Sequence, residues 1–198
     1  VYFRQGKYAE AEPLYQRALK IQKGTLPPDH PDIAATRHNL ASLYGRLEKY
    51  AEAESHFKAS LAISRKAPGQ EAGVARSLNN WGEMYVRQGK YAQAEPLLQE
   101  AVEIYEGLGE ENTRFAESLN HLASVYKAQG KYTESASHYR RALAIWEKAE
   151  GAAPPERIAC MSAYADLLRK MERADEAAEI EARVKALRSE EPQDAEEK

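Results

Sequence analysis

The chain has 198 residues and a formal net charge of −3, from 28 Lys and Arg against 31 Asp and Glu. Its mean hydropathy of −0.71 is low for a folded chain and is typical of an elongated fold with a large surface. No apolar stretch approaches the roughly 18 residues that a membrane helix needs, and the near-neutral charge argues against a dedicated nucleic-acid binder. A single cysteine, Cys160, cannot form an internal disulfide and favours a reducing compartment. We therefore expect a cytoplasmic protein without membrane or nucleic-acid partners.

Tyrosine is over-represented, with 12 Tyr against 3 Phe and 2 Trp, and an internal repeat explains the excess. The motif Gly6-Lys7-Tyr8 returns at Glu48-Lys49-Tyr50, Gly89-Lys90-Tyr91 and Gly130-Lys131-Tyr132, and a degraded fifth copy begins at Glu172. Successive motif tyrosines are 42, 41 and 41 residues apart. Each motif lies between two Ala- and Glu-rich runs with apolar residues three and four apart, which is the pattern of amphipathic helices. Links this short force the two helices of each pair into an antiparallel hairpin.

The predicted elements, in chain order, are a partial helix at 1–5 and helices at 8–24, 31–46, 50–65, 71–87, 91–107, 112–128, 132–149, 155–171 and 174–189. We group them as a single array over 1–188, with a partial repeat at 1–24 and repeats at 31–65, 71–107, 112–149 and 155–188. Gly89 and Gly130 are expected to end first helices in the left-handed conformation. Pro13 and Pro96 are expected on the outer side of second helices. The remaining segment 189–198 carries five acids and one lysine, a charge of −4, and is expected to be disordered.

The motifs Trp81-Gly82…Tyr85 and Ala94…Leu98…Ala101 resemble the tetratricopeptide repeat. The longer period and the segment from Leu26 to Tyr44 resemble the kinesin-light-chain type of this repeat. The resemblance implies an all-α fold, a right-handed α-solenoid of antiparallel hairpins whose first helices line a concave groove. The fifth copy departs most, because Ala174 replaces the motif tyrosine, and we expect it to be a cap rather than a ligand-binding repeat.

Aligning the copies assigns polar residues of the first helices to this groove. They are His38, Asn39, Ser42 and Arg46 in copy two; Arg76, Asn79, Asn80, Glu83 and Arg87 in copy three; Glu117, Asn120, His121, Ser124 and Lys127 in copy four; and Ser162, Asp166, Arg169 and Lys170 in copy five. The set holds six cations and three anions, a net charge of +3. The resemblance implies that Asn at the Asn39 and Asn80 position holds the main chain of a bound peptide.

The predicted partner is therefore a protein that presents an extended acidic peptide. The predicted contacts are Asn39, Arg46, Arg76, Asn79, Asn80, Arg87, Asn120, His121 and Lys127. Two simpler interpretations stay open. The Asn residues can bridge helices instead, and Arg46 and Arg87 lie in last turns, where cations suit the helix dipole.

Nothing in the sequence predicts catalysis, a metal or a cofactor. The five histidines lack a two-His metal spacing, and there is no Gly-x-Ser-x-Gly or phosphate-binding loop. His56 and His138 align with Leu14 and Leu97, so we expect them to pack. Cys160 aligns with Ser77 and Ser118 and is expected to be a small packed residue. We predict a non-enzymatic interaction scaffold.

Two alternatives to a peptide-binding scaffold remain. The chain begins at Val1 without a methionine, so it is expected to be part of a longer protein and could be the regulatory or sensor arm of a signalling protein. Copy one lacks most of its first helix, so the apolar face of the helix at 8–24 could instead pair with another copy and form a homo-oligomer.

Overall fold

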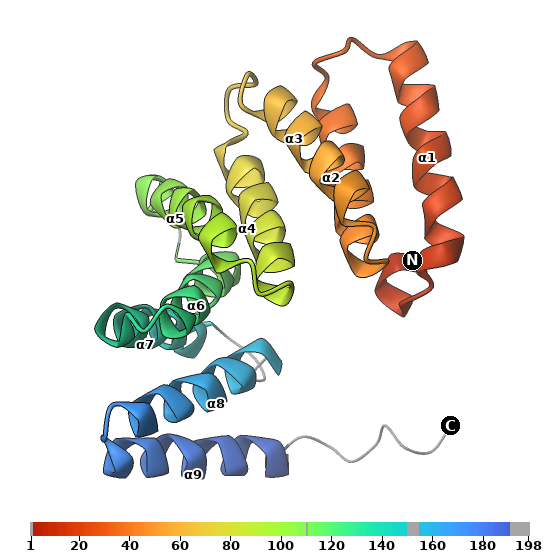
Figure 1. Cartoon of the computed structure of the whole chain (residues 1–198). Helices are drawn as coiled ribbons and strands as arrows, with labels where there is room; N and C mark the ends of the chain where they lie inside the picture. Colours follow the sequence, from red (N-terminus) through yellow and green to blue (C-terminus); the bar gives the residue numbers. More distant parts are fainter. Residues whose placement is uncertain (1, 110, 150–154, 191–198) are drawn as a thin grey trace. The chain divides into compact units, whose positions relative to one another are not determined.

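The computed structural model describes residues 2–109, 111–149 and 155–190, and every regular element within these ranges is a helix (Figure 1). The chain divides into two compact units: unit 1 is residues 1–109 and unit 2 is residues 110–198. The all-α class and the antiparallel hairpins predicted from the repeat are confirmed.

Unit 1 begins with a short 3-10 turn and continues with five α-helices that pack as stacked hairpins. The helices α2 and α3 form one hairpin, α4 and α5 form the next, α1 packs on α2, and α3 packs on α4. The helix α2 also contacts α4, so first helices form a directly packed layer. The elements are η1 (Tyr2–Gln5), α1 (Tyr8–Thr25), α2 (Pro31–Arg46), α3 (Tyr50–Ser64), α4 (Glu71–Arg87) and α5 (Tyr91–Leu108).

Unit 2 repeats this arrangement with two hairpins, α6 with α7 and α8 with α9, and again the first helices α6 and α8 touch. Its elements are α6 (Thr113–Ala128), α7 (Tyr132–Lys148), α8 (Pro155–Lys170) and α9 (Ala174–Glu190). Every predicted α-helix begins and ends within one residue of the observed one. Because α9 continues to Glu190, the first two residues of the predicted tail are helical. The rest of that tail, 191–198, lies outside the described residues.

The recurring Gly-Lys-Tyr motif is the turn that closes each hairpin. Gly89 and Gly130 take left-handed backbone conformations, with φ of 70° and 78°, as predicted. The next residue in each case is a lysine, whose backbone N–H donates to the tyrosine carbonyl five residues earlier at 2.9 Å, the bond of a Schellman cap. The Nζ atoms of Lys90 and Lys131 lie 5.9 and 5.0 Å from the ring centroids of Tyr85 and Tyr126. Tyrosine and lysine recur together because the turns of the first four copies use both.

Small and apolar residues fill the space between the helices of each hairpin. Ala53, Ala94 and Leu98 are fully buried, and Phe57 is 1% exposed. Pro13 and Pro96 lie inside α1 and α5 with exposed side chains, so the outward position predicted for them is confirmed. The polar residues predicted for the groove come from the first helices, which the hairpins hold in register.

Candidate functional site

The helices α2 and α4 of unit 1 carry six of the predicted contact residues, and five of these lie on the face that the two helices share. On α4, Asn80, Glu83 and Arg87 are spaced by three and four residues, so they project from one side of the helix. Asn39 and Arg46 have the same seven-residue spacing on α2 and are both exposed. The direct contact of α2 with α4 brings these two rows together. The other two predicted contacts of unit 1, Arg76 and Asn79, also lie on α4.

A chain of hydrogen bonds between α2 and α4 holds the Asn80 amide. The Nδ2 atom of Asn80 lies 3.3 Å from His38 Nε2, and Asn80 Oδ1 accepts from Asn79 at 3.3 Å. On the other side of the imidazole, His38 Nδ1 lies 2.9 Å from Ser77 Oγ. If Asn80 donates to Nε2, the proton of neutral His38 is on Nδ1 and points to Ser77. Asn80 is thereby oriented with one N–H and one lone pair unused by this network.

Two residues predicted to face the groove are instead buried between helices. His38 is 5% exposed and Asn79 is 4% exposed, and both take part in the network around Asn80. Each lies one residue before an amide of the face, and one residue turns the side chain by about 100° on an α-helix. That rotation directs His38 and Asn79 into the packed layer between α2 and α4. Asn79 therefore supports Asn80 from behind and is not accessible to a peptide.

The charges of this face are partly cancelled within the unit. Arg46 Nη2 lies 3.4 Å from Glu83 Oε1, which joins α2 to α4. Arg87 is exposed and makes no ion pair with any residue in the described ranges. Arg76 is half-buried on the same helix. With Arg46, Arg76 and Arg87 against Glu83, the face carries three positive charges and one negative charge, a net of +2.

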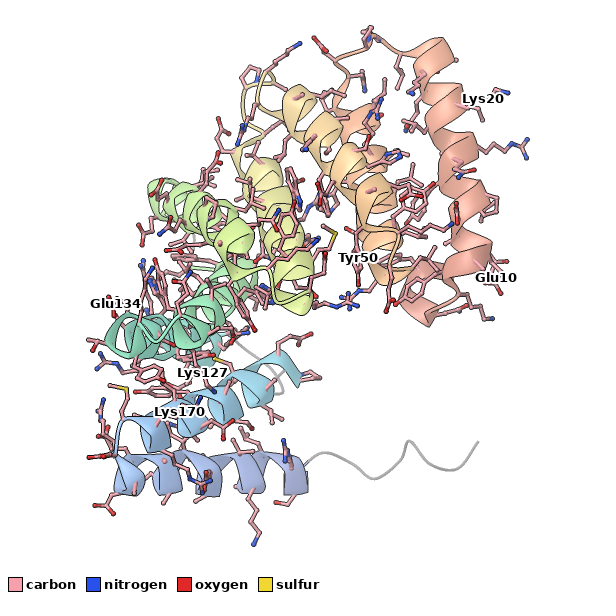
Figure 2. All side chains as sticks on the ribbon, viewed as in Figure 1. Glu10, Lys20, Tyr50, Lys127, Glu134 and Lys170 are labelled. Carbon is pink, nitrogen blue, oxygen red and sulfur yellow. The ribbon has the colours of Figure 1, made fainter. Side chains whose placement is uncertain are left out.

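In unit 2 the corresponding residues lie on α6, where Asn120 and His121 are half-buried. Lys127 also lies on α6 but is used in packing against α8: its Nζ donates to the carbonyl of Ala163 at 3.0 Å and lies 3.8 Å from Asp166 Oδ2. Burial lowers the pKa of Lys127, although the nearby Asp166 carboxylate acts in the opposite direction. Figure 2 labels Lys127 together with Lys170, which is exposed at the end of α8.

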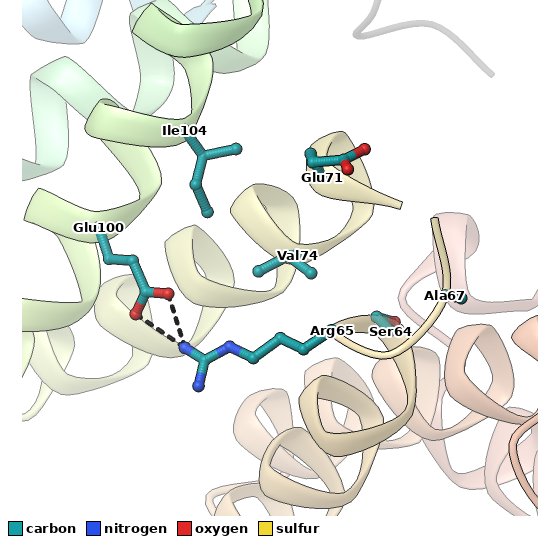
Figure 3. A pocket seen from close by; sticks show the side chains of 7 residues that line it. All are labelled: Ser64, Arg65, Ala67, Glu71, Val74, Glu100 and Ile104. Atoms are coloured by element: carbon teal, nitrogen blue, oxygen red, sulfur yellow. Dashed lines mark hydrogen bonds and ion pairs between the residues drawn. The ribbon is translucent and has the colours of Figure 1, made fainter. Parts of the chain in front are cut away.

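A pocket that the sequence did not predict opens where α3, α4 and α5 meet in unit 1 (Figure 3). It has a volume of about 380 Å³ and is lined by Ser64, Arg65, Ala67, Glu71, Val74, Glu100 and Ile104. Arg65 Nη2 donates to both carboxylate oxygens of Glu100, at 2.7 and 2.8 Å, and forms one wall. A signal was present in the sequence, because Ser64 stands at the repeat position that holds Tyr105 and Trp146 in later copies.

Cys160, His56 and His138 lie in packing environments. Cys160 is fully buried, and burial raises the pKa of its thiol to about 12, so the nucleophilic thiolate is strongly disfavoured. His56 and His138 pack on tyrosine rings, with centroids 5.4 Å from those of Tyr44 and Tyr126 respectively, as expected from their alignment with leucines. Among the described residues no group of three or more His, Cys, Asp or Glu could hold a metal. None of the helices in the described ranges is long and apolar enough to cross a bilayer.

Comparison with curated proteins finds short matches. The chain is 38% identical to Nephrocystin-3 of Xenopus laevis over 53 residues, which are 27% of this chain and 4% of that protein. Against Nephrocystin-3 of Homo sapiens it is 44% identical over 43 residues, 22% of this chain and 3% of that protein. The chain thus matches only a small part of the length of these relatives.

Comparison with solved structures covers nearly the whole chain. The crystal structure of BtubC (BKLC) from P. vanneervenii matches with a TM-score of 0.81 at 24% identity, over 95% of this chain and 76% of that one. A putative kinesin light chain of Podospora anserina with TPR-like repeats matches with a TM-score of 0.72 at 25% identity, over 97% of this chain and 92% of that one. Both likenesses support the solenoid of helix hairpins, and the second also supports the kinesin-light-chain type of repeat.

The family model described as "Tetratricopeptide repeat" matches residues 1–66, 32–107 and 114–190, which together span most of the chain. Repeats of this kind typically form non-catalytic scaffolds for protein–protein interaction. The repeated motifs, the stacked hairpins and the family match agree, and the chain belongs to the tetratricopeptide repeat family.

Proposed function

We propose that this protein binds an extended acidic segment of a protein partner, and that the α2–α4 face of unit 1 is the binding site. The observation that carries the proposal is the Asn80 amide, which His38 and Asn79 hold at 3.3 Å each while one donor and one acceptor remain unused. Asn39 lies exposed at the matching position of α2 and makes no hydrogen bond to any described residue.

The chemistry of this face matches a peptide main chain. An amide offers both a donor and an acceptor, so Asn39 and Asn80 can pair with the backbone of a peptide of any sequence. Because Asn80 is already oriented, less conformational entropy is lost on binding than for a free side chain. The surplus of positive charge, with Arg87 outside any ion pair of the described residues, favours an acidic ligand and accelerates its association.

In unit 2 we propose that His121, at the repeat position of Asn80, makes the equivalent contact on α6. We propose that Asn120 also contacts the ligand, because it is half-buried there, whereas Asn79 at the same repeat position is buried. Lys127 contributes positive potential there rather than a direct contact, since its Nζ already donates to the Ala163 carbonyl. The variant His121→Ala tests the contribution of the α6 contacts to peptide affinity separately from the contacts of unit 1.

The test is fluorescence anisotropy with a labelled glutamate–alanine peptide and a lysine–alanine peptide of equal length. We expect tighter binding of the acidic peptide, weakened by about fivefold to tenfold in Asn80→Ala because one backbone hydrogen bond is lost. Arg87→Glu should weaken it further, with an effect that shrinks as salt is added. The matched control is Lys20→Glu, the same charge change at an exposed position of α1 (Figure 2).

Two outcomes contradict the proposed site. One is equal affinity for the acidic and basic peptides. The other is a loss of affinity in Lys20→Glu as large as that in Arg87→Glu, because net charge alone would then explain the binding.

A second candidate function is self-association through α1. Leu14 and Ile21 on this helix are 53% and 55% exposed, whereas Ile63 and Ile145, which match Ile21 in later repeats, are 8% and 3% exposed. Sedimentation velocity should show a dimer that Leu14→Glu dissociates. A purely monomeric protein at high concentration excludes this candidate.

A further inference from the structure

The pocket between α3, α4 and α5 arises from one residue of the repeat. Fourteen residues after the motif tyrosines Tyr50, Tyr91 and Tyr132, the second helices carry Ser64, Tyr105 and Trp146. Tyr105 is 1% exposed and Trp146 is 2% exposed, so an aromatic side chain at this position is almost entirely enclosed. Ser64 leaves that volume unfilled, and the cavity of about 380 Å³ has Ser64 in its lining.

Unit 2 contains the corresponding corner, where α7 packs on the hairpin α8–α9, and there an aromatic residue is in place. Next to Trp146, Glu147 on α7 forms an ion pair with Arg183 on α9. In unit 1 the residues at the same two repeat positions are Arg65 on α3 and Glu100 on α5, which form the pair with the charges exchanged. An ion pair between the same two repeat positions is therefore common to both corners. The large aromatic side chain that lies beside this pair in unit 2 is missing in unit 1.

The open corner has apolar walls and an acidic surplus at its rim. Val74 and Ile104 project into it from α4 and α5, and Arg65 reaches across to Glu100 (Figure 3). Arg65 is satisfied by Glu100, but Glu71 makes no ion pair with any residue of the described ranges. One arginine against two glutamates gives the rim a net charge of −1.

We propose that this pocket is a second binding site, which takes an aromatic side chain of a protein partner with a lysine or arginine beside it. The ring occupies the volume that Trp146 fills in unit 2, against Val74 and Ile104, with the Arg65 guanidinium in reach of its face. The neighbouring cation pairs with Glu71. A volume of about 380 Å³ lies within the range of pockets that bind small ligands.

This site has the opposite charge preference from the α2–α4 face and shares no residue with it. The two sites can therefore be tested independently. Binding of an acidic peptide should be unchanged when the pocket is filled, so failure of one proposal is distinguishable from failure of the other.

The experiment uses small probes and NMR on the whole chain. The probes are tryptamine, an indole with an ammonium group, and indole-3-acetate, an indole with a carboxylate. We expect saturable binding of tryptamine in about the millimolar range, with nuclear Overhauser contacts from the indole ring to the methyl groups of Val74 and Ile104. Indole-3-acetate should bind roughly twofold to fivefold more weakly, the range expected from an exposed charge pair.

Three variants make the test specific. Ser64→Trp places an indole in the pocket as Trp146 does in unit 2 and should abolish tryptamine binding. Ser55→Trp makes the same substitution on the exposed side of α3 and should leave binding unchanged. Glu71→Gln should reduce the difference in affinity between the two probes.

The proposal is overturned if tryptamine binds Ser64→Trp as it binds the wild type, or if its binding does not saturate. Missing contacts from the probe to Val74 and Ile104 in the wild type also overturn it, whether or not Ser64→Trp folds. Equal affinity of both probes for the wild type removes the assignment of a cationic neighbour.

Discussion

A shift of one residue along a first helix separates an amide of the proposed binding face from an amide that is buried between helices. Asn80 is half-buried and held in place, while Asn79 is 4% exposed and lies between α2 and α4. The repeat alignment predicted both as contact residues because it reports equivalence between copies and not the angle at which a side chain leaves the helix. The depth of packing against the neighbouring first helix decides between them.

Close packing at Gly82 leads to a first prediction. A Cβ atom at this position would lie 2.6 Å from Leu98 Cγ, and Leu98 is fully buried, so Gly82→Ala should lower the free energy of unfolding. Overpacking costs about 1–3 kcal/mol, and the helix propensity gained, about 1 kcal/mol, offsets part of it. Denaturant unfolding measures the change.

The matched control is Gly45→Ala in the last turn of α2. A Cβ atom there would lie 3.6 Å from the Met84 side chain, which is an ordinary contact. This variant should raise the free energy of unfolding by about 0.5–1 kcal/mol. Equal gains in stability in both variants would show that Leu98 moves aside without cost.

His56 makes stability depend on pH. Burial lowers its pKa, as do Arg37 and Lys23, so the folded protein binds a proton less readily than the unfolded chain. The stability contributed by the neutral ring is complete above the unfolded pKa of about 6.5 and is lost as pH falls below it. We expect the thermal unfolding midpoint to decrease as the pH is lowered from neutral to mildly acidic. The dependence of the midpoint on pH should be shallower in His56→Leu. An identical slope in both proteins would contradict this role.

At the scale of the element, the turn motif specifies where each hairpin closes. The position that needs positive φ is glycine in three copies, but Glu48 and Glu172 occupy it at φ of 60°. The sequence predicted the turn in all copies because a basic residue follows in each copy and the helix spacing repeats. The sequence could not show that Glu48 and Glu172 adopt this positive-φ conformation, which is unfavourable for a residue other than glycine.

Substitutions at this turn should act in opposite directions. A non-glycine residue in the left-handed region costs about 1–2 kcal/mol, so Glu48→Gly should stabilise the protein by about 0.5–1 kcal/mol after the entropy cost of glycine is included. Gly89→Ala should destabilise it by about 1 kcal/mol. Thermal unfolding of both variants checks this, and a loss of stability in Glu48→Gly would mean that its side chain makes a compensating contact.

At the scale of the whole molecule, each hairpin is stabilised by its neighbours along the chain. In unit 1, α3 packs on α4, and in unit 2, α7 packs on α8. In such an array stability is a sum of repeat terms and nearest-neighbour interfaces. The sequence predicted the succession of hairpins but not the division into two compact units at Gly109.

Local disruption should therefore remain local. Leu78 and Leu119 occupy the same repeat position and are both fully buried, so replacing either by Ala should cost about 2–5 kcal/mol. In hydrogen exchange, Leu78→Ala should reduce protection most in α4, α5 and the hairpin α2–α3, and Leu119→Ala most in α6 and α7. Uniform loss of protection along the chain in both variants would indicate one fully cooperative unit.

The sequence alone determined the helices, their ends and their pairing, because periodicity, short links and turn residues act over distances of a few residues. It also determined the family and the row that holds Asn39 and Asn80. Only the tertiary structure decided that Asn79 is buried, that Arg46 is neutralised by Glu83, and that Lys127 packs against α8. It also revealed the pocket beside Ser64. These properties depend on contacts between helices that are separated along the chain. The residue on the opposite helix decides whether a side chain is exposed, buried or paired, and whether the space beside it is filled.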